Sequence, residues 1–291
     1  MTAKISITHF SDPGCPFAYS AAPALAVLRW RYGSQLDWRL VTIGLSEDAS
    51  RYDELGYTPT RMALGNLSFR RHGMPFALEP RSRSTATSRA CRAIVAARLN
   101  EPGREYDVHR ALQFAWFTTT LLLDEDADIE QALARIADLD AAKIVAAIDD
   151  AATITGYESD KDETRQAAGS ATEFQGKARQ SDGPVRYSAP SLVFEHDGTR
   201  LEAGGFQTIE AYDVLIANLD PTLERKAPAE DALEVLERFP EGVVSQEVAA
   251  IMAQNNQQPD RVAAEAALIE LAGAGRAHRT PLGDDALWQL A

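Results

Sequence analysis

The sequence predicts an α/β protein that is interrupted by a large helical insertion and followed by a small C-terminal module. Three observations indicate this: a β-α-β pattern at the N-terminus, a long helical region over 46–180, and the return of strand patterns near residue 191. We therefore expect a first domain built from 1–45 and 185–222, an all-helical insertion at 46–184, and a module at 229–291.

Composition and charge exclude several classes of protein. The chain has 291 residues, of which 45% are hydrophobic and 25% charged, as in ordinary globular proteins. Its net charge of −14 argues against nucleic acid or an anionic membrane as the main partner, because both are themselves negative. The longest apolar runs, such as 121–123, are far too short to span a bilayer.

The N-terminus and the cysteine count indicate the compartment. The first ten residues alternate between polar and apolar types, so they do not resemble a signal peptide, and we expect a cytoplasmic protein. Two cysteines, Cys15 and Cys91, exclude a disulfide framework and any metal site that needs three or four thiolates. The five histidines show no metal-ligand spacing, so no metal is expected.

The β-α-β unit at the N-terminus places Cys15 at a helix start. Ile5, Ile7 and His9 alternate with polar residues, which predicts a strand. A turn-forming stretch follows, and one helix is predicted from Phe17 to Tyr32, ended by Gly33. Residues 36–43 then read as a second strand.

The middle of the chain is predicted to be helical, and strands return after it. Helices are expected at 85–99, 106–121, 129–136, 141–148 and 163–178, with a loop over 70–83. Asp197-Gly198 stands between two strand-like runs, 191–195 and 200–202, and this spacing is a strong hairpin signal. A further helix is expected over 208–218.

The tail is predicted to form a winged-helix-like module. After a linker composition at 221–228, the pattern gives helices at 230–238, 245–254 and 260–273 and extended runs around 276–280 and 286–290. A winged helix often binds DNA through its third helix. Residues 228–291 carry four basic and eleven acidic residues, so a packing or protein-contact role is expected instead.

Cys15 is the candidate catalytic residue. Unpaired backbone N–H groups and the positive end of the helix dipole favour a thiolate at a helix start, and Pro16 fits the first helical turn. Asp12 acts in the opposite direction, since a nearby carboxylate raises a thiol pKa. The alternative is that Cys15 is a small buried residue with a packing role only.

Pro190 is the second feature of interest, because it stands directly before a predicted strand. An X-Pro bond can be cis at low cost, and a cis bond usually marks a tight turn. The pattern alone favours an ordinary trans proline at a strand start.

Together these residues resemble the DsbA-like thioredoxin-fold family, in particular its FrnE-type branch. The match is Asp12-Pro13-Gly14-Cys15-Pro16-Phe17-Ala18-Tyr19 with Ala189-Pro190, and the resemblance covers about residues 3–219. It implies a thioredoxin-like fold, a cis Pro190 facing Cys15, and a Pro190 loop that pairs its backbone with bound thiol or peptide. The branch has a second cysteine where this chain has Ala18, so Cys15 has no resolving partner within the motif.

The same stretch is also similar to 2-hydroxychromene-2-carboxylate isomerase and the kappa-class glutathione transferases. Those proteins carry serine at the position of Cys15, and the serine hydroxyl holds the thiolate of bound glutathione. The resemblance thus leaves two enzymatic interpretations, a thiol-disulfide oxidoreductase and a thiol-dependent isomerase or transferase. A non-catalytic binding protein on the same fold is the third.

We expect the oxidoreductase, with Cys15 as nucleophile and Pro16, Phe17, Ala189 and Pro190 contacting the substrate or thiol. No tightly bound cofactor is expected, and glutathione or mycothiol is the expected co-substrate. The expected partner is therefore a low-molecular-weight thiol or disulfide, and the sequence leaves the oligomeric state open.

Two further features carry weaker hypotheses. Cys91 lies on an Ala-rich predicted helix, where a packing role is favoured over that of a distant resolving thiol. Four arginines of the basic loop could gather the carboxylates of a small thiol, although a solvated loop is favoured; they are Arg70, Arg71, Arg81 and Arg83.

Overall fold

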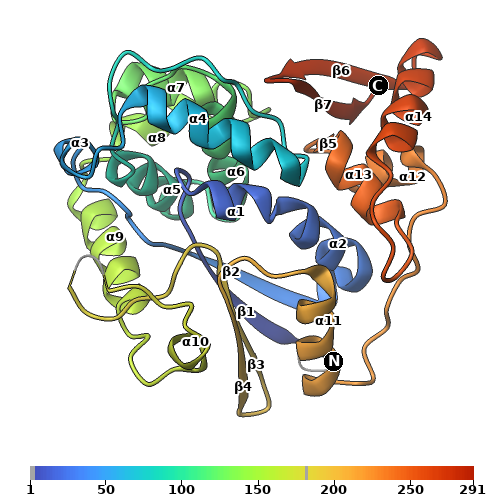
Figure 1. Cartoon of the computed structure of the whole chain (residues 1–291), viewed down its shortest axis with the longest axis horizontal. Coiled ribbons are helices and arrows are strands. Elements are labelled where there is room, and N and C mark those ends of the chain that lie inside the picture. The colour runs from blue at the N-terminus through green and yellow to red at the C-terminus, as the bar shows by residue number, and fades with distance from the viewer. Residues whose placement is uncertain (1–3, 181–182) are drawn as a thin grey trace.

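A four-stranded mixed sheet forms the centre of the first domain (Figure 1). The computed structural model describes residues 4–180 and 183–291. The strand order is β2-β1-β3-β4, and the strands are β1 (Ile5–Ser11), β2 (Leu36–Thr42), β3 (Ser191–His196) and β4 (Thr199–Gly204). The N-terminal β-α-β prediction is confirmed, because β1 and β2 pair in parallel with Ile5 opposite Leu36. Strand β3, from the far end of the insertion, pairs antiparallel with β1.

One face of the sheet carries the core of this domain. Ile5 and Ile7 alternate along β1 and so point to the same face, where both are fully buried. They pack against α2 (Ala22–Tyr32) and α11 (Ile209–Leu219) through residues such as Leu28 and Ile216. His9 follows Ile5 and Ile7 in the same alternation, which places a histidine at the end of this apolar row.

The single helix predicted from Phe17 to Tyr32 is wrong, because the structure has two. Helix α1 (Pro16–Ser20) ends at Ala21, and α2 begins at Ala22 with Pro23 in its first turn. Pro23 has no N–H to donate to the carbonyl of Tyr19 four residues earlier, so one continuous helix cannot pass through it. Cys15 therefore precedes a helix of only five residues.

The insertion is helical, as predicted. Its helices are α3 (Ser50–Glu54), α4 (Pro59–Phe69), α5 (Ser88–Asn100), α6 (Glu105–Thr118), α7 (Asp126–Leu133), α8 (Ala141–Ala146), α9 (Ala151–Thr164) and α10 (Ala171–Phe174). The expected loop over 70–83 is confirmed apart from one 3-10 turn, Arg70–His72. The largest apolar cluster of the described residues lies here, around Leu112, Trp116 and Ile144.

The helix predicted over 163–178 is wrong. The long helix α9 ends at Thr164, and the short α10 starts only at Ala171 with Ser170 as its N-cap. Gly169 and Gly176 have φ of 75° and 69°, in the left-handed region that ends helices. The apolar spacing suggested a continuous helix, and the two glycines interrupt it.

The late hairpin and the helix after it form as predicted. Strands β3 and β4 pair antiparallel, with His196 opposite Thr199. The two residues between them, Asp197 and Gly198, both have positive φ, which a two-residue type I′ turn requires. This hairpin completes the sheet next to β1 and brings the residues before Ser191 close to the N-terminal motif.

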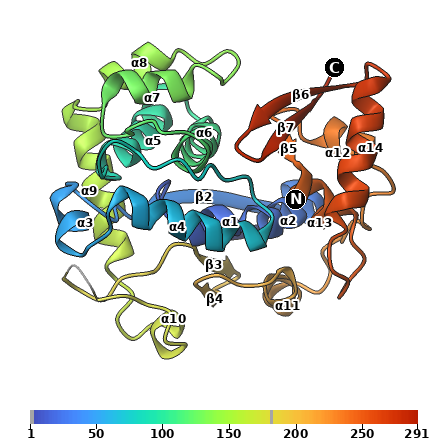
Figure 2. The ribbon, with the colours of Figure 1, turned by 45° about the horizontal axis from the view of Figure 1, so that its top comes forward.

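The C-terminal residues form helices and a small sheet of their own. The elements are α12 (Ala232–Arg238), β5 (Val243–Val244), α13 (Ser245–Met252), α14 (Arg261–Gly273), β6 (Ala277–Leu282) and β7 (Asp285–Leu290). The sheet order is β5-β7-β6, and the short β5 was not expected from the sequence. Helix α13 packs on α2, so this part of the chain contacts the first domain directly; Figure 2 shows it beside the insertion, with α1 and α2 between them.

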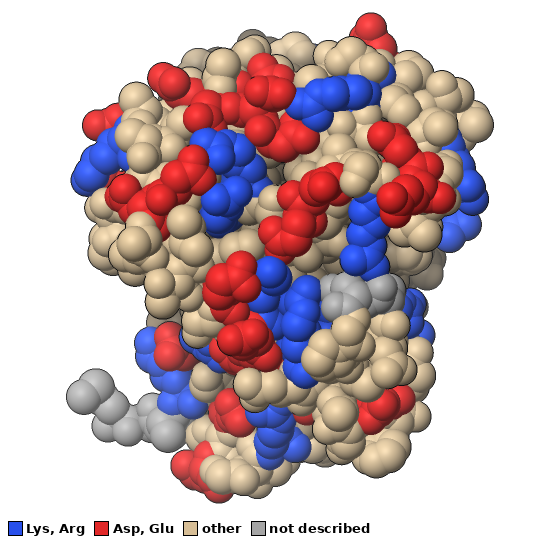
Figure 3. All heavy atoms as spheres, turned by 90° about the vertical axis from the view of Figure 1, so that its left-hand side faces the viewer, with Lys and Arg blue, Asp and Glu red and all other residues tan. Residues whose placement is uncertain are grey.

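The surface carries both signs of charge. On the face drawn in Figure 3, Lys and Arg side chains are interspersed with Asp and Glu. Within residues 4–180 and 183–291, no helix combines the length and apolar character that crossing a bilayer requires.

Candidate functional site

A tight turn positions Cys15 at the start of α1. The Cys15 amide donates to the carbonyl of Asp12 at 3.2 Å, and the Gly14 amide donates to the Asp12 carboxylate at 2.9 Å. Cys15 has extended backbone angles, and Pro16 opens the helix, where its missing N–H costs nothing. Only glycine fits at position 14, because a Cβ there would lie 2.6 Å from Cγ2 of Thr87.

The Pro190 loop lies directly against Cys15. The Cys15 Sγ donates to the carbonyl oxygen of Ala189 at 3.2 Å, and the Ala189–Pro190 peptide bond is cis. The resemblance therefore predicted this loop correctly, whereas the pattern alone favoured a trans bond. Two segments 174 positions apart in the sequence thus form one site.

The burial of Cys15 opposes the thiolate that the helix start predicted. Only 7% of Cys15 is exposed, and burial raises the pKa of its thiol to about 11. The Asp12 carboxylate raises this pKa further, while the amides of Ala18 and Phe17 lower it. Because α1 has five residues and ends at Ala21, its dipole is too small to outweigh the loss of solvation.

Asp12 is a buried carboxyl group beside both cysteines. It is 0% exposed and accepts hydrogen bonds from the backbone of Gly14 and Leu45, each at 2.9 Å. The Thr87 hydroxyl donates to it at 3.1 Å, and the Cys91 Sγ lies 3.5 Å away. Burial raises the pKa of Asp12, and the hydrogen bonds oppose that shift.

An exposed aromatic group stands beside the site. Phe17, which the sequence predicted as an apolar wall, is 48% exposed. Its ring packs edge-on against Phe69 with centroids 4.8 Å apart, and the centroid of the Phe206 ring lies 6.4 Å away. Sequence reasoning missed Phe69 and Phe206, although Phe206 directly follows Gly204-Gly205 at the end of the hairpin.

The remaining candidates have structural roles. Cys91 is fully buried and reduced, and burial next to Asp12 raises its pKa well above the usual value. Three of the four arginines proposed to gather a ligand's carboxylates bind within the chain instead, and the fourth, Arg71, is exposed beside His72. Arg83 pairs with Asp124 at 2.8 Å, and Arg70 pairs with Asp284 at 2.5 Å. In the part of the chain that the structure describes, no three His, Cys, Asp or Glu side chains gather as metal ligands do.

Comparison with solved structures identifies the fold. A candidate disulfide isomerase from Nitrosomonas europaea is 17% identical with a TM-score of 0.55, over 74% of this chain and 97% of that one. The cytosolic disulfide reductase DsbM from Pseudomonas aeruginosa is 17% identical with a TM-score of 0.52, over 75% of this chain and 100% of its own. A DsbA oxidoreductase homologue from Streptomyces coelicolor is 16% identical with a TM-score of 0.55, over 78% and 93% of the two chains. DsbM has also been solved with GSH.

No family model matches the chain, and no curated protein does. The protein therefore has the thioredoxin fold of DsbA-like proteins, interrupted by a helical insertion. The shared region is about three quarters of the chain, so it leaves a substantial part of the sequence without a counterpart in these structures.

Proposed function

We propose that the protein is a thiol-disulfide oxidoreductase in which Cys15 is the exchanging thiol. The observation that carries this proposal is the contact between the Cys15 Sγ and the carbonyl of Ala189, next to the cis Pro190. The DsbA-like fold supports the reaction class, and the aromatic group around Phe17 offers an apolar surface beside the sulfur.

The exchange needs a thiol from outside the chain. The Cys15 thiolate attacks a disulfide RS–SR′, which forms a Cys15–S–SR mixed disulfide and releases R′S⁻. A small thiolate then attacks the sulfur of R, which frees Cys15 and carries R away as a new disulfide. Ala18 has no sulfur and Cys91 is fully buried, so a second thiol must come from solution. Glutathione or mycothiol has the required chemistry, and a structure of DsbM contains GSH.

The Pro190 loop has a defined task in this scheme. While Cys15 is a thiol, its S–H occupies the carbonyl oxygen of Ala189. A thiolate or a mixed disulfide has no such hydrogen, so the carbonyl becomes free to accept an N–H of the bound substrate. Loss of the proton from Cys15 and binding of a peptide-like thiol are therefore coupled at one oxygen atom.

A second candidate, a glutathione-dependent isomerase or transferase, is favoured by the neutral state of Cys15. A thiol with a pKa of about 11 keeps its proton at neutral pH, and this thiol already donates a hydrogen bond to Ala189. It could therefore hold the sulfur of a bound thiolate, as the serine does in the similar isomerases. In that case glutathione performs the chemistry and Cys15 only orients it.

Three variants distinguish these functions: Cys15→Ser, Cys15→Ala and the matched control Cys91→Ala. The assay is the glutathione-dependent reduction of a glutathionylated peptide, with mass spectrometry to trap a glutathione adduct on Cys15. We expect wild type and Cys91→Ala to react, and both Cys15 variants to lose at least about 100-fold in rate. Full exchange by Cys15→Ala contradicts the proposal. Thiol-dependent isomerisation that survives in Cys15→Ser but not in Cys15→Ala establishes the second candidate.

The same preparation gives the protonation state of Cys15. Alkylation of Cys91→Ala by iodoacetamide should accelerate about tenfold per pH unit up to a pH near 11, because only the thiolate reacts. A plateau already reached at pH 7 means that Cys15 is ionised at rest and removes the argument for the second candidate.

A further inference from the structure

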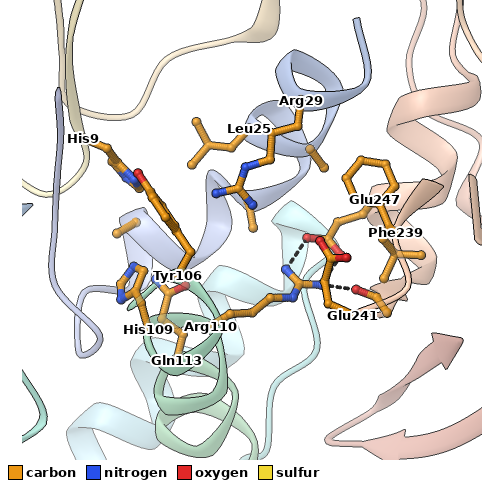
Figure 4. Close-up of a pocket in the computed structure, with 15 residues that line it drawn as sticks. His9, Leu25, Arg29, Tyr106, His109, Arg110, Gln113, Phe239, Glu241 and Glu247 are labelled. Carbon is orange, nitrogen blue, oxygen red and sulfur yellow. Dashed lines mark hydrogen bonds and ion pairs between the residues drawn. The ribbon is translucent and has the colours of Figure 1, made fainter. Parts of the chain in front are cut away.

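A cavity of about 50 Å³ lies where the first domain, the insertion and the C-terminal module meet. It is lined by His9 of β1, Arg29 of α2, Tyr106 and His109 of α6, and Phe239 after α12 (Figure 4). Ala18, at the position of the missing second cysteine, also lines it. The cavity is separate from the carbonyl and the aromatic side chains that surround the Cys15 sulfur, so its function does not depend on the proposed exchange reaction.

Several buried polar atoms around this cavity have no hydrogen-bond partner among the described residues. They are both ring nitrogens of His9, the Tyr106 hydroxyl, Nδ1 of His109 and Nε of Arg110. His9 is 2% exposed, and its ring lies parallel to that of Tyr106 with centroids 6.1 Å apart. Each unpaired buried polar atom costs about 1–3 kcal/mol, and native structures contain few of them. A cluster at one cavity therefore indicates that a polar ligand supplies the missing partners.

The charges around the cavity indicate that this ligand is an anion. The Arg29 guanidinium lies 4.8 Å from the centroid of the Tyr106 ring, and no carboxylate pairs with it within the described residues. Arg110, the other cation of the wall, is held by two hydrogen bonds to Glu247 at 2.7 and 2.6 Å. Glu247 thus neutralises Arg110, whereas Arg29 has no ion-pair partner among the described residues, and the exposed Glu241 lines the cavity as well.

The two histidines add hydrogen-bonding capacity but no charge. Burial lowers the pKa of His9 well below its usual value and that of His109 to about 3, and Arg29 lowers both further. His109 uses its Nε2 to bond the Ser11 hydroxyl at 3.0 Å, which leaves its Nδ1 free. Each neutral ring can donate through one nitrogen, so His9 is able to donate to an anion that Arg29 attracts.

Size and lining restrict the anion further. On the scale of this volume one water molecule needs about 10–15 Å³, so the cavity holds a molecule of only a few heavy atoms. Leu25 and Phe239 give it apolar walls, and Glu241 and Glu247 line another part. A single free guanidinium matches a single negative charge, whereas a phosphate dianion would place its second charge near two glutamates.

We propose that this cavity is a binding site for a small monocarboxylate such as acetate or propionate. Its oxygens accept hydrogen bonds from Arg29 and from His9 or the Tyr106 hydroxyl, and its short alkyl chain contacts Leu25 and Phe239. Because residues 239–247 form one wall, the C-terminal module completes the site.

The test is calorimetric titration of the full-length protein with sodium acetate and sodium propionate, compared with sodium chloride and sodium phosphate at equal ionic strength. We expect saturable binding of the carboxylates and none of chloride. Arg29→Met should weaken this binding at least about 10-fold, with partial recovery in Arg29→Lys. Arg135→Met, at an exposed arginine of the insertion, is the matched control and should bind as wild type.

A second readout needs no substitution at Arg29. Long-range ¹H–¹⁵N spectra of the wild type should show the His9 ring nitrogens shifting on addition of acetate, with His9→Phe identifying those signals. Stronger binding of phosphate overturns the assignment to a monocarboxylate. Equal effects of chloride and acetate, or His9 nitrogens that do not shift, mean that the cavity holds only water and overturn the proposal.

Discussion

The buried polar groups around Asp12 and those around the cavity beside His9 both lie next to α1. The two regions differ in how many of these groups have a hydrogen-bond partner. Below Cys15, the Asp12 carboxylate receives two backbone amides, the Thr87 hydroxyl and the thiol of Cys91. Around the cavity, both nitrogens of His9 and the Tyr106 hydroxyl have no partner among residues 4–180 and 183–291. The first region holds a turn in place by itself, and the second is incomplete without a ligand. Burial alone does not distinguish a polar group with a structural role from one that binds a ligand. The number of its hydrogen-bond partners within the protein does distinguish them.

The largest difference in stability is expected between two variants, one that alters the Asp12 carboxylate and one that removes the His9 ring nitrogens. Asp12→Asn turns an amide N–H₂ toward backbone and hydroxyl donors, so we expect it to lower the free energy of unfolding by about 3–5 kcal/mol. His9→Phe removes nitrogens that bond nothing, so it should lower the free energy of unfolding by no more than about 1 kcal/mol and can raise it. Urea denaturation measures both. A loss from His9→Phe as large as that from Asp12→Asn would mean that His9 has partners in the folded protein.

The pH dependence of stability tests the neutral state of the cavity histidines. Because the folded-state pKa values of His9 and His109 are lowered, the unfolded chain binds protons first as the pH falls below about 6.5. Their contribution is thus present above that pH and is lost below it, by about 1.4 kcal/mol per pH unit for each histidine.

This loss is measured as the free energy of unfolding between pH 6 and pH 5. His9→Phe should remove about half of the slope. His278→Gln, at an exposed histidine outside the cavity, is the control. An unaltered slope in His9→Phe would show that His9 is protonated in the folded state.

The smallest effect concerns two tyrosines whose hydroxyl groups are buried. The Tyr19 hydroxyl donates to the carbonyl of Pro75 at 2.9 Å, so Tyr19→Phe should cost about 1 kcal/mol. The Tyr106 hydroxyl has no partner among the described residues, so Tyr106→Phe should leave the free energy of unfolding unchanged or raise it. Thermal unfolding without added carboxylate compares the two, and a larger loss in Tyr106→Phe would reverse the distinction between the regions.

The sequence predicted most elements because local patterns determine them. Alternation identified β1, the Asp197-Gly198 pair identified the hairpin, and helical spacing identified α5, α6, α7 and α8 but missed α3, α4 and α9. The errors occurred where one residue overrides a pattern: Pro23 divides the first helix, and Gly169 interrupts the apolar spacing after α9. Strand β5 has only two residues, too few to produce a period.

The sequence predicted which residues form the candidate site, but it did not predict the direction of the pKa shift of Cys15. Cys15 and Phe17 stand out in the sequence, and the resemblance supplied the cis Pro190. The direction of the thiol pKa shift depends on burial and on Asp12, and burial arises from packing between segments far apart in the chain. The cavity could not be predicted for the same reason. His9 and His109 are 100 positions apart, and their rings approach to 6.3 Å between centroids only in the folded protein.

The stretch before the C-terminal module, which has the composition of a linker, is fastened to α2. The Trp30 indole donates to the carbonyl of Ala227 at 2.7 Å, and the Lys226 ammonium lies 3.4 Å from the centroid of the same indole ring. The Lys226 amide also donates to the carbonyl of Arg31 at 2.9 Å. These contacts hold the linker against α2, so it does not act as a flexible tether. The cavity wall formed by residues 239–247 is thus anchored, through this stretch, to the same part of the chain that carries Arg29.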